Sequence, residues 1–233
     1  MRVDMEVGEL LGSGRTADVY AIDGERVLRR YRVGLDARRE AEVIAYVAAH
    51  GYPVPELYPG TEQATDLVMG RLTGPTMLRA VLDGGITPEE VGEVLARLLL
   101  RLHEIPARVS EGPDDRVLHL DLHPDNVMLT PLGPVVIDWG NSREGPPGLD
   151  CAMSAVIIAQ VAVDEDSEFA ATARAILAAL LAGLGGAMDF GEGLERAKAT
   201  RGANPTLTER EISLLDDAVR LIRAPRAPAR SAG

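Results

Sequence analysis

The pattern of hydrophobic and polar positions changes character along this chain. Up to about residue 69 the apolar runs are short and interrupted by polar residues and turn formers, which is typical of strands. Beyond that point apolar residues recur at helical spacing in longer runs, which is typical of core helices. The pattern predicts an α+β fold with an N-terminal sheet lobe at 1–69, a mainly helical lobe at 70–223, and a disordered tail at 224–233.

The N-terminal lobe is expected to contain five strands and one helix. Asp23-Gly24 is a strong signal for a two-residue hairpin turn. Asp36 is a candidate N-cap for a helix that runs to about His50 and stops at Gly51. The expected strands lie at residues 7–11, 19–20, 26–32, 56–58 and 66–69.

The C-terminal lobe is expected to be built from core helices. Thr87-Pro88-Glu89-Glu90 is a capping box with proline at the first helical position, and the helix it begins ends near His103. Residues 152–163 and 169–184 are apolar, but they are shorter than the roughly 20 residues that span a bilayer. We therefore expect buried helices and no membrane partner, with one more helix after Asn204-Pro205-Thr206.

The most informative stretch lies between these helices. Residues 127–129 and 135–137 are short apolar runs joined by a Pro/Gly turn at 130–134, which predicts a hairpin. The hairpin would bring Asn126 beside Asp138, with Asp121 one loop earlier. Phosphoryl transfer needs a carboxylate for the acceptor hydroxyl, and an amide oxygen and a carboxylate for Mg²⁺. An Asx turn beside two buried strands is the structural alternative, and three matching groups at matching spacing argue against it.

The motif His119-x-Asp121-x-His123-Pro124-x-Asn126, followed by Ile137-Asp138-Trp139, resembles the aminoglycoside phosphotransferase family, which has a two-lobe protein-kinase-like fold. The resemblance covers about residues 7–160 and implies Asp121 as catalytic base, with Asn126 and Asp138 as Mg²⁺ ligands. The His-Pro pair, and tryptophan after the metal aspartate, resemble small-molecule kinases more than protein kinases. The segment after Asp138 is short and has no activation loop. Asp150, at the start of the next helix, is expected to brace the catalytic loop.

A nucleotide-binding set completes the resemblance. Gly12-Ser13-Gly14 resembles the kinase glycine-rich loop, in which backbone N–H groups approach phosphate and Ser13 adds a hydroxyl. The family's third glycine is missing, with Ala17 or Asp18 near its place, and the glycines taken alone would indicate an ordinary turn.

The kinase-like fold also places a cation on a strand, where it holds the α- and β-phosphates. Lys198 is the only lysine, so this cation must be an arginine, and the resemblance selects Arg29. It also implies an ion pair with Glu40; Glu42, about 200° further round the helix, is the alternative. Met69 starts the segment that resembles the adenine-binding hinge.

Composition restricts the partners. A net charge of −12 argues against nucleic acid and is compatible with a cationic acceptor. The acids at 164–168 form either a solvated turn or a patch for ammonium groups. Cys151 is the only cysteine, so no internal disulfide forms, and with no signal-peptide pattern this suits a reducing cytoplasm.

The sequence therefore predicts an enzyme that moves the γ-phosphate of ATP, with Mg²⁺, to a hydroxyl of a small molecule. The alternatives are a kinase of another metabolite, an atypical protein kinase, and a nucleotide-binding module without catalysis. The missing third glycine and the arginine in place of lysine count slightly for the last alternative, and the intact Asp121, Asn126 and Asp138 count against it.

Overall fold

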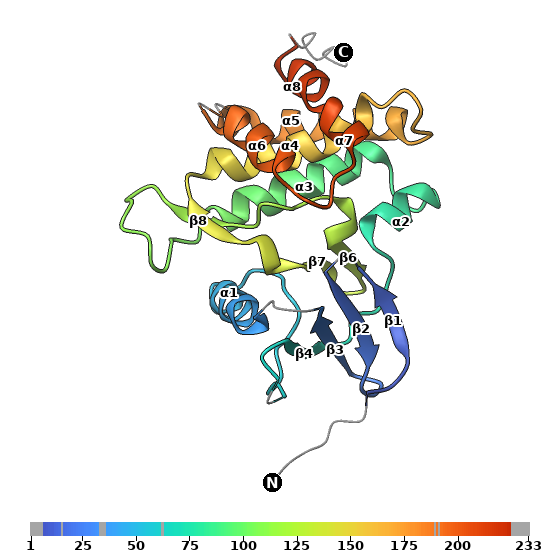
Figure 1. The fold of residues 1–233 in the computed structure, drawn as a ribbon, viewed down its shortest axis with the longest axis vertical. Helices are drawn as coiled ribbons and strands as arrows, with labels where there is room; N and C mark the ends of the chain where they lie inside the picture. Colours follow the sequence, from blue (N-terminus) through green and yellow to red (C-terminus); the bar gives the residue numbers. More distant parts are fainter. Residues whose placement is uncertain are drawn as a thin grey trace.

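The computed structural model describes residues 7–14, 16–32, 36–61, 63–188, 190 and 192–224. A small sheet and one helix form one end of the molecule, a helical bundle forms the other, and a β-hairpin lies between them (Figure 1). The sheet is antiparallel with the order β1-β2-β3-β4. Its strands are β1 Leu10–Ser13, β2 Ala17–Ala21, β3 Arg26–Tyr31 and β4 Asp66–Gly70. The predicted tail lies, from residue 225 onward, outside the described residues.

The prediction of a fifth strand at 56–58 is wrong for the described part of the chain. Leu57 forms only an isolated bridge to Met69, although two backbone hydrogen bonds tie this segment to β4. Pro55 and Pro59 flank the segment and have no N–H group to donate. The ladder therefore stops after one bridge, and the sheet has four strands.

Helix α1 (Ala37–Ala49) begins and ends as the sequence predicts. The Asp36 side chain accepts a hydrogen bond from the backbone N–H of Arg38, and Gly51 follows the helix with a φ of +76°. The helix buries residues at helical spacing: Ala37, Glu40, Val43, Ile44 and Val47. An acid thus occupies a position on the buried face.

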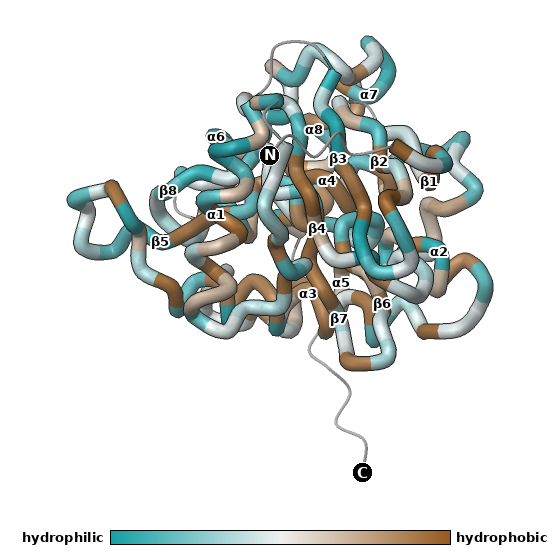
Figure 2. The backbone as a smooth tube through the Cα atoms, turned by 90° about the horizontal axis from the view of Figure 1, so that it is seen from below, coloured by the Kyte–Doolittle hydropathy of each residue, from teal (hydrophilic) through white to brown (hydrophobic). Residues whose placement is uncertain are grey.

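The helical part packs around α4, which is buried on almost every side. Figure 2 shows hydrophobic residues along α3, α4 and β4. The helices are α2 Met77–Leu82, α3 Pro88–Leu102, α4 Pro147–Ala162, α5 Ala170–Leu184, α6 Gly193–Gly202, α7 Glu209–Ser213 and α8 Leu215–Arg223. None of the described helices combines the length and the apolar character needed to cross a membrane.

Three helix boundaries can be compared with the predicted ones. The capping box of Thr87 and Glu90 begins α3 as predicted. Helix α4 begins at Pro147, earlier than predicted, because proline fits the first helical turn; this places Asp150 in that turn. The single helix predicted after Thr206 is divided into α7 and α8 at Leu214.

Helices α3 and α5 approach closely because a glycine lies at their crossing. A Cβ atom on Gly92 would lie 2.4 Å from the backbone oxygen of Ile176 and 2.6 Å from the N atom of Leu180. A larger residue at this position would push the two helices apart.

The hairpin that carries the candidate site has the predicted pairing but a tighter turn. Strand β6 (Val127–Thr130) pairs with β7 (Gly133–Val136), so only residues 131–132 form the loop. Pro134 fits into β7 because both strands of a two-stranded sheet are edge strands. A second antiparallel pair joins β5 (Arg116–Leu118) to β8 (Arg143–Gly145). Strand β5 precedes the hairpin in the chain, and β8 follows it.

Candidate active site

The loop between β5 and β6 is held in place by the buried carboxylate of Asp150. Its Oδ2 accepts a hydrogen bond from the backbone N–H of His119 (2.9 Å), and its Oδ1 accepts one from that of Leu120 (2.7 Å). His103 Nε2 lies 3.0 Å from Oδ2. Leu120 has a φ of +63°, a conformation that a non-glycine residue keeps only when its surroundings impose it. The predicted bracing role of Asp150 is confirmed.

The ionised form of Asp150 is favoured although the side chain has no solvent exposure. Burial works against the charge, but the hydrogen bond from His103 and the two backbone N–H groups hold the pKa of Asp150 below its ordinary value. The Asp150 carboxylate therefore stays ionised at neutral pH and can accept the hydrogen bonds of the loop.

The Asn126 side chain in this loop is hydrogen-bonded to the backbone of Asp121. Asn126 ends a 3₁₀ turn (Pro124–Asn126) and donates from Nδ2 to the backbone oxygen of Asp121 at 2.8 Å. With the amide nitrogen used in this way, the side-chain oxygen is the atom left for a ligand. Asp121 Oδ2 accepts a hydrogen bond from Asn141 Nδ2 at 3.3 Å. Asn141 comes from the 3₁₀ turn Trp139–Asn141, which follows Asp138.

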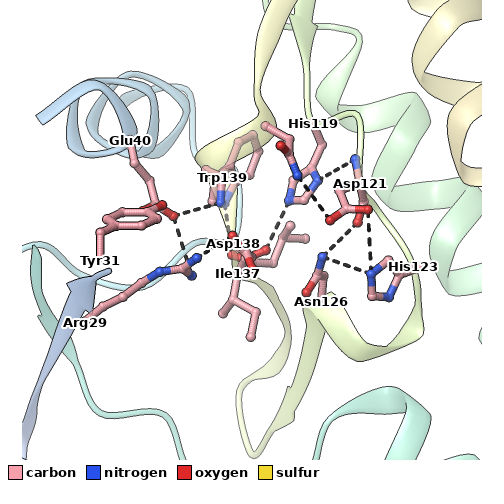
Figure 3. Close-up of polar contacts among 12 residues, drawn as sticks. Arg29, Tyr31, Glu40, His119, Asp121, His123, Asn126, Ile137, Asp138 and Trp139 are labelled. Carbon is pink, nitrogen blue, oxygen red and sulfur yellow. Dashed lines mark hydrogen bonds and ion pairs between the residues drawn. The ribbon is translucent and has the colours of Figure 1, made fainter. Parts of the chain in front are cut away.

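Asp138 completes the set at the end of the hairpin. The backbone N–H of Ile137 donates to the backbone oxygen of Asn126 (3.0 Å), so the two strands hold Asn126 and Asp138 at the same end. Asp138 has a φ of +66°, and its side chain is 35% exposed. Figure 3 shows Asp138 between the Asp121–Asn126 group on one side and Arg29 on the other.

The predicted ion pair between Arg29 and Glu40 is present. Arg29 Nη1 lies 3.7 Å from Glu40 Oε1, while the alternative, Glu42, has a side chain that is 69% exposed. Arg29 also donates from Nη2 to Asp138 Oδ1 at 2.5 Å, a contact the sequence did not indicate. Burial disfavours its charge, but Glu40 and Asp138 outweigh that effect and hold the pKa of Arg29 above its ordinary value.

Glu40 has two further hydrogen-bond partners that were not predicted from the sequence. Tyr31 donates its hydroxyl to Glu40 Oε2 at 2.5 Å, and the backbone N–H of Trp139 donates to Oε1 at 2.9 Å. Tyr31 stands on the same face of β3 as Arg29, and this alternation was the available signal. The contact of Asn141 with Asp121 could not be predicted in this way, because no local sequence pattern pointed to Asn141.

Gly12 and Ser13 end β1, where they pair with β2, and Gly14 follows in the connection between the two strands. Gly12 has no heavy atom within 4 Å of a Cβ position, so its surroundings are open. The hydroxyl of Ser13 donates to Asp18 Oδ1 at 2.7 Å and accepts from Arg32 Nη2 at 2.5 Å. Asp18, near the place of the missing glycine, thus cross-links the turn, and the Ser13 hydroxyl is already engaged.

Met69 is buried in β4, at 8% exposure. The next two backbone N–H groups have partners within the protein: Gly70 donates to the oxygen of Glu56 and Arg71 to that of Glu25. These donors are therefore already used at the start of the segment that resembles a hinge.

The histidines that flank Asp121 both hold the loop. His119 donates from Nε2 to the backbone oxygen of Ile137 and accepts from the N–H of Asp121. His123 accepts from the N–H of Asp125, and its Nε2 lies 3.8 Å from Asp121 Oδ1. Burial holds the pKa of His123 below its ordinary value despite the nearby carboxylates.

The acidic cluster at 164–168 has an internal cation. Arg210 of α7 reaches both Asp164 (2.5 Å) and Asp166 (2.6 Å), and the hydrogen bond from Arg210 lowers the pKa of Asp164. These contacts favour the structural interpretation of the cluster over a patch for ammonium groups.

Two cavities border α1, with volumes of about 290 and 490 Å³. Neither is lined by Asp121, Asn126 or Asp138. In the part of the chain that the structure describes, no group of three or more His, Cys, Asp or Glu side chains is arranged to hold a metal ion. A metal here would have to use a smaller protein set, such as one amide and one carboxylate oxygen.

The arrangement as a whole defines a class of protein. A sheet lobe with a glycine turn and an Arg–Glu pair faces a helical lobe with an Asp, Asn and Asp set, as in small-molecule kinases. The sequence profile of the phosphotransferase enzyme family (APH) matches residues 7–116 and 105–194. This chain belongs to that family, and it is a phosphotransferase that acts on hydroxyl groups of small molecules.

Solved structures with similar folds include two kinds of small-molecule kinase, and no curated protein sequence matches the chain. A choline/ethanolamine kinase family protein from Mesorhizobium loti has a TM-score of 0.58 at 15% identity, over 93% of this chain and 88% of that one. The ADP-bound aminoglycoside phosphotransferase APH(2'')-Ib has a TM-score of 0.59 at 14% identity, over 94% and 93%. Choline kinase LicA from Streptococcus pneumoniae has a TM-score of 0.57 at 13% identity, over 94% of each chain. These likenesses confirm the protein-kinase-like fold.

Proposed function

We propose that this chain transfers the γ-phosphoryl group of ATP, bound with Mg²⁺, to a hydroxyl of a small molecule. The observation that carries the proposal is the convergence of Asp121, Asn126 and Asp138 at one end of the β6–β7 hairpin, with Arg29 in contact with Asp138. Phosphoryl transfer requires these groups in one place, since it depends on positioning and on countering phosphate charge.

The side chains fit a nucleotide with its metal. Among the described residues Arg29 Nε is buried without a hydrogen-bond partner, so this guanidinium has a donor left for a phosphate oxygen. The oxygens of Asn126 and Asp138 are the hard ligands that Mg²⁺ prefers, and Mg²⁺ takes few protein ligands. When bound there, Mg²⁺ would counter charge on the phosphates.

The roles of the remaining residues follow from their positions. Asp121 orients the acceptor hydroxyl and receives its proton as the oxygen–phosphorus bond forms and the γ-phosphate leaves the nucleotide. Asn141 holds the Asp121 carboxylate, and Glu40 holds Arg29. Gly12 and Gly14 leave room for phosphate oxygens, while Ser13 supports the turn through Asp18. Met69 supplies an apolar wall for the base.

We place the boundary between a nucleotide lobe and an acceptor lobe after Met69. The linker that follows lies tightly against the hairpin: Gly74 has a φ of +123°, and its Cβ position would be 2.0 Å from the oxygen of Leu129.

The single buried cysteine fits a reducing compartment, and we propose the cytoplasm.

The acceptor that the charge supports is a cationic alcohol. The net charge of −12 raises the local concentration of cations around the protein. Two kinds of similarly folded protein bear names of cationic compounds, the aminoglycosides and choline or ethanolamine. An amino sugar or an amino alcohol is therefore the first acceptor class to examine.

The test is MgATP-dependent transfer followed by mass spectrometry, with aminoglycosides, amino alcohols, neutral sugars and a generic protein as acceptors. We expect a gain of one phosphate on a cationic small molecule. Asp121→Asn should lower kcat by about 10²–10⁴-fold and leave nucleotide affinity nearly unchanged. Asp125→Asn, a change of charge in the same loop, is the matched control.

The alternatives predict different outcomes. Transfer only to the generic protein would indicate a protein kinase. Nucleotide binding without any transfer, and with Asp121→Asn indistinguishable from the wild-type protein, would indicate a binding module.

A further inference from the structure

Tyr31 makes the shortest side-chain contact to Glu40. It lies on β3, two positions after Arg29, and is 6% exposed. Its hydroxyl donates to Glu40 Oε2 at 2.5 Å, and the Arg29 guanidinium lies 5.1 Å from the centre of its ring. Figure 3 shows Tyr31 and Arg29 approaching the same carboxylate from one strand.

The three contacts of Glu40 differ in length. The two short hydrogen bonds come from Tyr31 and from the backbone N–H of Trp139 (2.9 Å), whereas Arg29 stays 3.7 Å away. The short contact of Arg29 is instead the one to Asp138. Glu40 is thus oriented by neutral donors and acts on Arg29 as a nearby countercharge.

We propose that Tyr31 is a positioning residue for nucleotide binding: its hydroxyl occupies Glu40 Oε2 and so keeps the Arg29 guanidinium directed toward Asp138 and the phosphates. This inference rests on the proposed function, because it concerns how the same site holds a nucleotide.

The physical reason lies in the shape of the arginine side chain. A guanidinium presents parallel N–H donors that match both oxygens of one carboxylate. Without the Tyr31 hydroxyl, Glu40 Oε2 would be a buried anionic oxygen short of a donor, and Arg29 could satisfy it by closing on both oxygens. That movement would withdraw Arg29 from Asp138. A lysine, with one ammonium group, would not need such a restraint.

The surroundings reserve space for the hydroxyl. A Cβ atom on Gly140 would lie 2.8 Å from the hydroxyl oxygen of Tyr31. Burial, reinforced by Glu40, raises the pKa of Tyr31, so its hydroxyl stays protonated and remains a donor at neutral pH. Gly140→Ala therefore provides a second way to displace the hydroxyl without altering Tyr31.

The experiment compares Tyr31→Phe with Tyr52→Phe. Tyr52 is also buried, but its hydroxyl donates to the backbone oxygen of Leu98 instead of to Glu40. For Tyr31→Phe and Gly140→Ala we expect the Kd of MgADP, measured by calorimetry, and the KM for ATP to rise about tenfold. The KM for the acceptor should stay unchanged. Tyr52→Phe should lower Tm without changing the Kd of MgADP.

An Arg29→Lys background sharpens the test, because lysine cannot form the two-pronged contact. There Tyr31→Phe should change the Kd of MgADP by less than about threefold. A folded Tyr31→Phe protein with wild-type Kd and KM for ATP would overturn the inference, as would an equal effect of Tyr52→Phe. If the wild-type protein fails to bind MgADP, the proposed function falls first and this inference with it.

Discussion

Two buried carboxylates hold the two halves of the site, and they do so in different ways. Asp150 accepts hydrogen bonds from two backbone N–H groups of the catalytic loop and from His103, all of them in the helical lobe. Glu40 accepts one backbone N–H group, from Trp139, and otherwise meets the side chains of Tyr31 and Arg29. Glu40 therefore joins a helix of the sheet lobe to the segment after Asp138.

The difference indicates which half is fixed and which half can be perturbed. Backbone groups cannot rotate away from Asp150, and the positive φ of Leu120 depends on that anchorage. The partners of Glu40 are mostly side chains, and these can exchange partners when one is removed. We expect changes at Asp150 to affect stability and the whole site, and changes at Glu40 to affect nucleotide binding selectively.

The largest effect is expected from Asp150→Ala. Two buried N–H groups would lose their acceptor and His103 its partner, which should lower the free energy of unfolding by about 3–5 kcal/mol. Urea denaturation at pH 7 measures this loss. Asp216→Ala, which removes an exposed carboxylate paired with Lys198, is the control and should have little effect. Equal losses in both variants would contradict the anchoring role of Asp150.

The same carboxylate should give stability a dependence on acid pH. The pKa of Asp150 is lower in the folded protein than in the unfolded chain, where it is about 3.9. Its contribution is therefore present above that value and is lost as the pH falls through the folded-state pKa. The difference in unfolding free energy between wild type and Asp150→Ala should shrink steadily below about pH 4. A difference that stayed constant down to pH 3 would argue against an ionised Asp150.

Glu40→Gln should have a smaller and more selective effect. The single oxygen of glutamine can still accept from the Trp139 N–H group, and its NH2 group can donate to the hydroxyl oxygen of Tyr31, but the negative charge beside Arg29 is lost. We expect the KM for ATP to rise about tenfold while the KM for the acceptor and the urea midpoint change little. Glu42→Gln, on the exposed face of α1, serves as the control. A loss of stability as large as that of Asp150→Ala would remove the contrast between the two carboxylates.

The smallest expected effect is a change in the alkylation rate of Cys151, which reports on local opening around Asp150. Burial raises the pKa of its thiol to about 12, and the side chain has no exposed surface beside Asp150. Alkylation by iodoacetamide at pH 8 should therefore be slow in the native protein and fast in urea. Asp150→Ala should accelerate the native reaction by roughly tenfold, and Glu40→Gln should leave it unchanged. Equal acceleration in both variants would show that the two halves of the site open together.

Much of the fold could be predicted because its signals are local. The cap at Asp36, the capping box at Thr87 and the hairpin at 127–136 each depend on a few neighbouring residues. The errors arose where local signals competed. Prolines removed the donors that a fifth strand would have needed, and Pro147 began α4 earlier than its apolar run suggested.

The sequence by itself determined that Asn126 and Asp138 stand near Asp121. The spacing to Asn126 and the short hairpin to Asp138 leave the backbone few ways to arrange them, so their proximity could be foreseen. The choice of Glu40 over Glu42 came from the resemblance to the kinase family, and Glu40 indeed lies on the buried face of α1.

Only the tertiary structure decided what Arg29 contacts. Its partner Asp138 is 109 residues away in the chain, and the Trp139 N–H group that meets Glu40 is 99 residues away. No local rule fixes such pairs, because they depend on how the packed sheet lobe meets the helical lobe. The residue types set the chemistry, and the packing of the two lobes determined which charges meet.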